Sequence, residues 1–297
     1  MALDLTGQPW IDLEPEAFER RLEEGRFDPW RDQARQLHRD GFCLLDLADP
    51  DLLACCDAVI EGLSPRMAAE LQHWREGLGG PPRLQDGWQN HPEIRAIALH
   101  PAILGLLRRL YGREPFAFQT LNFAVGSQQH VHSDAIHFHS YPHGFMCGVW
   151  VALQDIEPAS GPLQYYPASH RLPYHSAASL GLDASQVAAE PHPQRFFEPL
   201  WRQALQDSSL EQCRFLPRRG QALIWHANLL HGGSPVADRT STRWSQVTHY
   251  FFEGCLYTTP LKSFDQEHGG PCLRNPFDIA RGARRFTESE WRALGGA

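Results

Sequence analysis

The chain has 297 residues and carries 35 acidic against 27 basic side chains, a formal net charge of −8. An acidic chain without a run of basic residues lacks the electrostatic footprint of a nucleic-acid-binding protein. No apolar run approaches the roughly 18 residues that span a bilayer, and the N-terminus lacks the basic and apolar regions of a signal peptide. We therefore expect a cytoplasmic protein with no nucleic-acid or membrane partner, whose oligomeric state is open.

The first third of the chain favours helices. Its segments carry apolar residues at helical spacing, and several end at glycine. A short strand is expected at 42–47, and the stretch 79–92 is typical of a turn-rich connector. The expected helices are 14–25, 29–41, 50–63, 64–78 and 100–112.

From about Phe116 the pattern changes to short segments rich in aromatic and β-branched residues, bounded by Gly, Pro, Asp or Ser. Many short strands in succession are typical of a sandwich, barrel or jelly roll. The expected strands are 116–125, 145–156, 162–167, 213–218, 221–231 and 243–252.

No linker separates the helical and β-rich parts, so we expect a single domain over residues 1–297. It would consist of an N-terminal helical layer (about 1–112), a β core (about 113–255) and a C-terminal extension (256–297). Residues 172–211 are partly helical and lie between two strand segments. An insertion of that length in a β core is often a lid over a pocket.

The residue types present exclude several kinds of chemistry. Seven cysteines at irregular spacing, with no C-x-x-C pair, are typical of reduced, buried thiols. The one lysine, Lys262, follows no glycine-rich loop, which excludes a P-loop. The H-E-x-x-H and G-x-S-x-G motifs are also absent. Catalysis would have to come from the sixteen histidines and the acids.

Residues 130–139, HVHSDAIHFH, combine four histidines with one carboxylate. A mononuclear non-haem iron site uses two histidines and one carboxylate on one face of the metal. Residues i and i+2 of a strand point to the same side, so His132 and Asp134 are predicted to supply two ligands. His130 has the same parity, but an H-x-H site for zinc or copper would leave Asp134 unexplained.

The third ligand is expected from a later strand. Residues 221–231 offer His226 and His231, which are five apart and would face opposite sides of a continuous strand. His231 ends the apolar run and precedes Gly232 and Gly233, where backbone can lie close to a bound ligand. We therefore favour His231.

A chelating dicarboxylate needs a cation for its far end, and the planar fork of arginine pairs with a carboxylate through two hydrogen bonds. Arg243 lies twelve residues after His231, inside the expected strand 243–252, and Ser245 shares its face. A buried arginine there needs a partner. Arg239 is the alternative, but it lies in a predicted loop.

In this order, these residues resemble the phytanoyl-CoA dioxygenase family of Fe(II)/2-oxoglutarate-dependent oxygenases. The resemblance rests on His132-Ser133-Asp134, on GVWVALQDIEPASGPLQYYPASH (148–170), and on LIWHANLLHGG with Arg243 behind it. It spans about 116–252. It implies a fold that is mainly β with flanking helices, built on a double-stranded β-helix (jelly-roll) core.

The resemblance also implies roles for individual residues. The iron ligands would be His132, Asp134 and His231, and Arg243 would bind the C5 carboxylate of 2-oxoglutarate. Further residues at positions that line the cosubstrate in this family are Trp150, Gln119 and Asn122. Gly233 departs from the family because a serine often stands there, which removes a hydrogen bond to the cosubstrate, and Ala168 replaces a glycine in a turn.

The expected cofactor is Fe(II), with 2-oxoglutarate and O2 as cosubstrates. The expected reaction is hydroxylation of a C–H bond of a small molecule, with release of succinate and CO2. Desaturation, epoxidation and cyclisation use the same ligands and stay open. Asp134 argues against halogenation, since related halogenases leave that position vacant for halide. His130, His137 and His139 are expected to line the substrate cavity.

A cupin-like metal- or sugar-binding module without oxygenase activity is the alternative outside this enzyme class. Arg243 discriminates between the two, because such a module has no need of a buried cation behind its last ligand.

Overall fold

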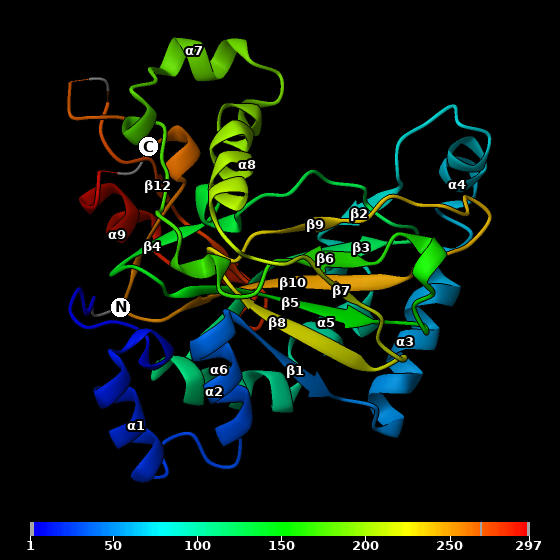
Figure 1. Cartoon of the computed structure of the whole chain (residues 1–297), viewed down its shortest axis with the longest axis horizontal. Coiled ribbons are helices and arrows are strands. Elements are labelled where there is room, and N and C mark those ends of the chain that lie inside the picture. Colours follow the sequence, from blue (N-terminus) through cyan, green and yellow to red (C-terminus); the bar gives the residue numbers. More distant parts are fainter. Residues whose placement is uncertain (1–2, 268, 296–297) are drawn as a thin grey trace.

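A computed structural model describes residues 3–267 and 269–295 (Figure 1). The α-helices are α1 (Pro15–Glu23), α2 (Arg31–Asp40), α3 (Pro50–Leu63), α4 (Ala68–Arg75), α5 (Pro92–Ala98), α6 (Pro101–Tyr111), α7 (Ala184–Ala189), α8 (Glu198–Asp207) and α9 (Glu288–Ala293). The 3-10 helices are η1 (Trp10–Asp12), η2 (Gly87–Gln89), η3 (Asp134–Ile136), η4 (Pro158–Ser160), η5 (Ser169–Arg171), η6 (Ala178–Leu180), η7 (Pro193–Phe196) and η8 (Pro260–Lys262).

The strands form a major sheet and three smaller ones. The strands are β1 (Phe42–Asp46), β2 (Arg83–Gln85), β3 (Pro115–Phe123), β4 (His139–Tyr141), β5 (Met146–Ala152), β6 (Leu163–Tyr165), β7 (Cys213–Phe215), β8 (Gln221–His226), β9 (His231–Gly233), β10 (Ser245–Phe252), β11 (Leu256–Thr258), β12 (Leu273–Arg274), β13 (Phe277–Asp278) and β14 (Ala283–Arg284). The major sheet has the order β1-β8-β5-β10-β3-β2, and all of its pairings are antiparallel.

Alternation along the major strands divides the core into two layers. In β8, Leu223 and Trp225 belong to a cluster that also holds Leu163 of β6 and Phe215 of β7, so this face meets the small sheet β7-β6-β9. Ile224 belongs to the larger cluster, which faces the helices. Because successive strand residues point to opposite faces, the jelly-roll interior lies between the two sheets and the helical core lies outside them.

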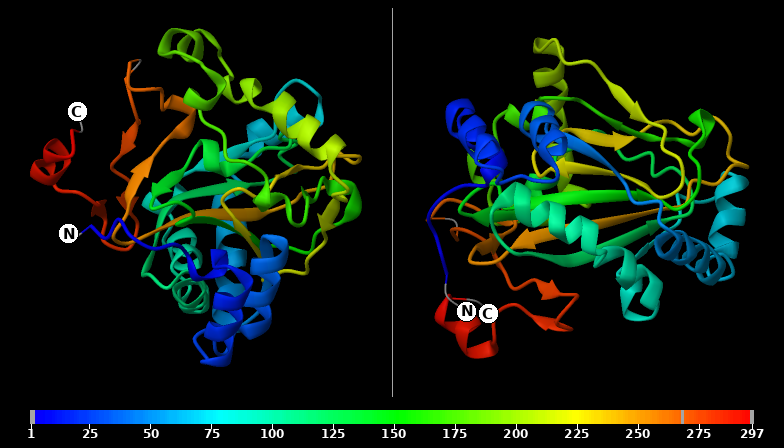
Figure 2. Two further views of the ribbon diagram at one scale, coloured as in Figure 1. Left: turned by 60° about the vertical axis from the view of Figure 1, so that its left-hand side comes forward. Right: turned by 90° about the horizontal axis from the view of Figure 1, so that it is seen from below.

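The N-terminal helices cover the outer face of the major sheet. Figure 1 shows α1, α2, α5 and α6 on one side of this sheet and α7 and α8 on the other, and the view from below in Figure 2 shows α6 lying across the strands. The Asp49 carboxylate caps α3 by accepting from the backbone N–H groups of Asp51 and Leu52. Helix α6 ends at Gly112 with φ 73°, where a Cβ atom would lie 2.3 Å from the Trp10 ring.

The predicted insertion is partly helical, as expected, and contains α7 and α8. Its Phe197 and Trp201 are buried against Ile136 and Leu230. Ile136 is the last residue of η3, and Leu230 immediately precedes β9. The aromatic residues of the insertion therefore pack directly on the two chain segments that hold the predicted metal ligands.

The mainly β fold with flanking helices is confirmed, but the connector 79–92 is more ordered than predicted. It contains the three-residue edge strand β2, which pairs with β3, and leads directly into α5, a helix that the sequence pattern did not predict. The expected strand 221–231 is broken into β8 and β9. Among the described residues, no helix is both long and apolar enough to cross a membrane.

Candidate metal centre

His132 and His231 are joined through their backbones. They form an antiparallel bridge in which the N–H of His132 donates to the carbonyl of His231 at 2.9 Å and the reverse bond is 3.0 Å. His231 begins β9, so His132 extends the small sheet by one residue. The paired backbones place the two imidazole rings side by side, with centroids 4.5 Å apart.

Asp134 does not lie in a strand, which corrects the premise of the H-x-D prediction. It opens the 3-10 helix η3, and the Ser133 side chain caps that helix by accepting from the N–H of Ala135. Ser133 Oγ also donates to Oδ1 of Asn228 at 2.9 Å. The turn still brings the carboxylate beside His132, but side-chain capping fixes it rather than the two-residue strand period.

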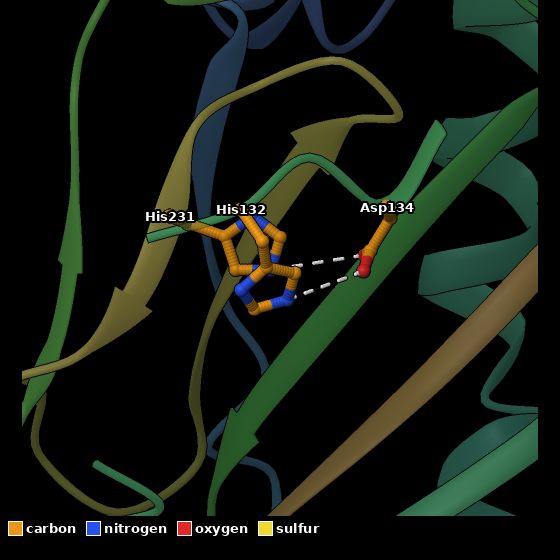
Figure 3. A group of neighbouring side chains, drawn as sticks. All are labelled: His132, Asp134 and His231. Atoms are coloured by element: carbon orange, nitrogen blue, oxygen red, sulfur yellow. Dashed lines mark ion pairs between the residues drawn. The ribbon is translucent and has the colours of Figure 1, made fainter. Parts of the chain in front are cut away.

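The three predicted ligands converge on one point inside the jelly roll (Figure 3). His132, Asp134 and His231 are each 5% exposed, and one ligand atom from each lies within 4.8 Å of the others. The Nε2 atoms of His132 and His231 are 3.6 and 3.7 Å from the Asp134 carboxylate oxygens. These distances are too long for good hydrogen bonds, so the donor atoms face a common space without satisfying one another.

Backbone hydrogen bonds set the tautomers of both histidines. His132 Nδ1 is 2.8 Å from the carbonyl of His130, and His231 Nδ1 is 3.0 Å from that of Leu229. A carbonyl only accepts, so each Nδ1 carries the proton and each Nε2 keeps a free lone pair. Two imidazole nitrogens and one carboxylate, oriented in this way, fit the donor set of non-haem Fe(II).

Electrostatics act differently on the three ligands. Burial opposes protonation of His132, but interaction with the adjacent Asp134 carboxylate raises its pKa above the usual value. Burial lowers the pKa of His231 to about 4, so its ring is neutral. Burial opposes ionisation of Asp134, but the surrounding imidazoles, His231 first, hold its pKa well below the usual range. His231 and Asp134 are therefore ready to bind a cation.

Arg243 lies two residues before β10 rather than inside it, and it borders the same cavity as the three ligands. Its side chain is 2% exposed. Nη2 donates to the carbonyl of Val125 at 3.3 Å, while Nε has no partner among the described residues. Buried guanidinium donors without an anion are costly, and a carboxylate of 2-oxoglutarate would satisfy them. The alternative, Arg239, is exposed and stacks on Trp74.

The other residues predicted to bind the cosubstrate differ in their position relative to the metal cavity. Trp150 borders the cavity beneath Arg243, whose guanidinium is 5.3 Å from its ring. Ser245 is fully buried, shares the cavity-facing parity of Val247, and its Oγ has no partner among the described residues. Gln119 does not border the cavity; its amide contacts His249 at 3.1 Å.

Two predicted site residues, Asn122 and His139, lie away from the metal cavity. Asn122 faces away from the cavity, because its neighbours Leu121 and Phe123 point inward; its amide donates to Gln246 in the helical core. His139 lies on β4 in a different sheet, stacked on Tyr174 and bonded to His143, so it borders no cavity near the ligands.

Gly232 and Gly233 make room for protein backbone, and Gly232 also borders the metal cavity. A Cβ atom on Gly232 would lie 2.8 Å from the Gln129 carbonyl, and one on Gly233 would lie 2.5 Å from the Gln128 nitrogen. The segment before His132 therefore lies directly against β9. His226 turns to the helical side, where its ring contacts Asp12 at 3.3 Å.

A second cavity lies between the insertion and residues 128–130. His130 contacts Glu198 of α8 at 3.0 Å, and His137 contacts Gln194 of η7 at 3.1 Å. Both histidines border this cavity, and Gln129 borders both it and the metal cavity. The insertion thus lies over the approach to the metal centre.

Two residues next to Asp134 were missed by the sequence analysis. His249 and Trp225 both border the cavity and approach the Asp134 carboxylate at 3.3 and 2.9 Å. The alternation that places Arg243 and Ser245 on one face of the strand continues through Val247 to His249. The same strand pattern therefore predicts that His249 faces the cavity.

A jelly roll with a buried His–Asp–His cluster and a buried arginine on one cavity is the arrangement of non-haem iron, 2-oxoglutarate-dependent oxygenases. The phytanoyl-CoA dioxygenase (PhyH) family matches residues 37–241. The chain belongs to this family, and it is therefore a non-haem iron and 2-oxoglutarate-dependent enzyme. Family membership favours the enzyme over the alternative of a binding module without enzymatic activity.

Solved structures of several proteins share this fold. The epimerase SnoN, in complex with Fe3+, alpha-ketoglutarate and nogalamycin RO, is 20% identical with a TM-score of 0.57, over 91% of this chain and 97% of that chain. The non-haem alpha-ketoglutarate-dependent carbocyclase SnoK from nogalamycin biosynthesis is 17% identical (TM-score 0.56; 95% and 97% covered). EctD from S. alaskensis with bound Fe is 18% identical (TM-score 0.53; 74% and 76% covered). A comparison with curated protein sequences returns no match.

Proposed function

We propose that this enzyme hydroxylates a C–H bond of a small molecule, converting 2-oxoglutarate and O2 to succinate and CO2. One oxygen atom of O2 enters the product and the other enters succinate. The observation that carries the proposal is the shared cavity: the His–Asp–His cluster and a buried arginine with an unpartnered Nε border the same space. A metal centre with a dicarboxylate site beside it needs both the ligand cluster and the buried cation.

In this proposal His132, Asp134 and His231 hold Fe(II). Their Nε2 and carboxylate donors occupy one face and leave the other for cosubstrates. Bound Fe(II) supplies the O2 activation that side chains cannot perform. The protein contributes a buried site that excludes water and fixed imidazole tautomers.

Arg243 is the proposed partner of the C5 carboxylate of 2-oxoglutarate. Its guanidinium can donate two parallel hydrogen bonds to a carboxylate. Trp150 forms part of the cavity wall beneath it, and Ser245 offers a buried hydroxyl on the same side. Because Gly233 lacks a side chain, a hydroxyl at that position cannot assist.

The substrate is proposed to enter beside the insertion. His130 and His137 border the outer cavity and are tied to Glu198 and Gln194 of the insertion. Side chains from the insertion therefore select the substrate, while the metal centre carries out the chemistry. We place the whole chain in one cytoplasmic catalytic domain without a nucleic-acid or membrane partner.

The fold also occurs in enzymes with other outcomes. SnoN is an epimerase and SnoK a carbocyclase, so epimerisation and ring formation, with desaturation and epoxidation, are the competing outcomes. Product mass separates hydroxylation from all of these except epoxidation, which also adds one oxygen atom and is distinguished by the structure of the product. Hydroxylation adds one oxygen atom, desaturation and cyclisation remove two hydrogens, and epimerisation leaves the mass unchanged.

The test has two stages. Anaerobic addition of Fe(II) and 2-oxoglutarate should produce the weak visible charge-transfer band of the chelate. A screen of small molecules by succinate release, followed by product mass, should then identify a substrate that gains oxygen. A protein that forms no chelate band and releases no succinate with any substrate would contradict the proposal.

A further inference from the structure

Two side chains of the major sheet approach the carboxylate of Asp134. Nε1 of Trp225 donates to Oδ2 at 2.9 Å, and Nε2 of His249 lies 3.3 Å from the same oxygen. Trp225 comes from β8 and His249 from β10. Trp225 is 2% and His249 4% exposed, so both contacts are shielded from bulk solvent.

Both donors are themselves fixed in orientation. His249 Nδ1 lies 3.1 Å from the Gln119 amide, which can present either its oxygen or its NH2 group to the ring. The ring of His249 also contacts Phe138, with centroids 5.0 Å apart. Trp225 lies directly against Gly148, where a Cβ atom would lie 2.2 Å from the indole. Neither donor can turn away without repacking its surroundings.

The two oxygens of Asp134 have different neighbours. Oδ2 accepts from Trp225 and lies 3.3 Å from Nε2 of His249 and 3.7 Å from Nε2 of His231, whereas Oδ1 lies 3.6 Å from Nε2 of His132. A facial site must keep three positions open, two for 2-oxoglutarate and one for O2. A carboxylate that bound the metal through both oxygens would take one of them.

We infer that Trp225 and His249 are positioning residues that reserve Oδ2 and leave Oδ1 to bind the metal. This inference rests on the proposed ligand set. It assigns a task to this buried pair, which borders the metal cavity together with Arg243. Hydrogen-bonding partners of metal ligands typically contribute about 10- to 100-fold in metal affinity or activity.

The test uses Co(II) as a spectroscopic probe of the apo protein, in the absence of 2-oxoglutarate and turnover. Trp225→Phe and His249→Phe keep an aromatic ring and lose the donor. His249→Gln places an amide NH2 near the position of Nε2. Tyr250→Phe is the matched control, because it removes a buried hydrogen bond, from Tyr250 to the Ala98 carbonyl, on the other face of the same strand.

Both phenylalanine variants should bind Co(II) about 10- to 100-fold more weakly and change its visible absorption. His249→Gln should restore most of the affinity, and Tyr250→Phe should bind as the wild type does. In the Fe(II) form, the phenylalanine variants should also need more 2-oxoglutarate to reach the full charge-transfer band. Wild-type Co(II) affinity and spectrum in both phenylalanine variants would overturn the inference.

Asp134→Ala separates this inference from the proposed function. If it abolishes Co(II) binding while the phenylalanine variants bind normally, the ligand set stands and only the positioning role fails. If Asp134→Ala binds Co(II) as the wild type does, the ligand set itself is wrong.

Discussion

Replacing Arg243 with methionine should remove 2-oxoglutarate binding without harming the fold. The side chain is 2% exposed, with one hydrogen bond to the Val125 carbonyl and an unpartnered Nε. Burial lowers the pKa of Arg243 from 12.5 to about 10. That difference corresponds to about 3 kcal/mol of penalty on the charged form. The ligand-free variant should therefore be as stable as the wild type, or more stable by about 1–3 kcal/mol.

Although the substitution should not destabilise the fold, it should weaken the binding of 2-oxoglutarate. Loss of one partner of a buried charge pair costs about 2–5 kcal/mol, so affinity should fall by roughly 30-fold to several thousand-fold. A ligand that binds only the folded state adds about 2.7 kcal/mol of stability at a hundred times its Kd. The wild type should gain this stabilisation from 2-oxoglutarate, and Arg243→Met should not.

Chemical denaturation of the metal-loaded proteins, with and without 2-oxoglutarate, measures both effects. Arg239→Met is the control, because Arg239 is exposed and lies outside the cavity; it should keep the full shift with 2-oxoglutarate. The reasoning is refuted if Arg243→Met is clearly less stable than the wild type and still gains the full stabilisation from 2-oxoglutarate. Arg243 would then be a structural residue.

Three further predictions concern the metal, the packing and the pH dependence. Asp134→Ala should retain its far-UV circular dichroism but show no Fe(II)·2-oxoglutarate band and no succinate release; normal turnover would show that the ligand set is wrong. Gly148→Ala should cost about 1–3 kcal/mol in urea denaturation and weaken Co(II) binding, because the new methyl displaces Trp225; Gly80→Ala, where a Cβ atom meets open space, should be neutral. Burial lowers the pKa of His139 to about 3, so the unfolded chain takes up a proton near pH 6.5 and the folded chain does not. The stability should then fall with decreasing pH by up to about 1.4 kcal/mol per pH unit between those values, and His139→Gln should flatten this slope; an unchanged slope would exclude His139 as its source.

The sequence pattern predicted the larger elements because each carries its own signal. The strands β3, β5 and β10 are long enough for aromatic and β-branched residues to stand out. The edge strand β2 has only three residues within a glycine- and proline-rich stretch, and its strand conformation comes from pairing with β3. No local pattern reveals such a strand, because its partner lies more than thirty residues away.

At the site, the sequence limited which side chains carry the chemistry, whereas the tertiary structure decided their roles. Residue type and spacing pointed to His132, Asp134, His231 and Arg243, which the fold brings onto one cavity. Whether a side chain faces that cavity depends on strand register and on where strands break, which excluded Asn122. These features are set by packing between sheets that are distant in sequence.

The residues around Asp134 likewise separate what the sequence determines from what the tertiary structure decides. Any strand histidine is a ligand candidate from sequence alone, but His249 meets Asp134 only because β10 and the turn before β4 approach each other inside the jelly roll. The sequence by itself determined a histidine- and carboxylate-based metal chemistry with a cationic partner. Tertiary structure decided which carboxylate oxygen is free for the metal, because hydrogen bonds at that distance depend on three-dimensional position rather than on local pattern.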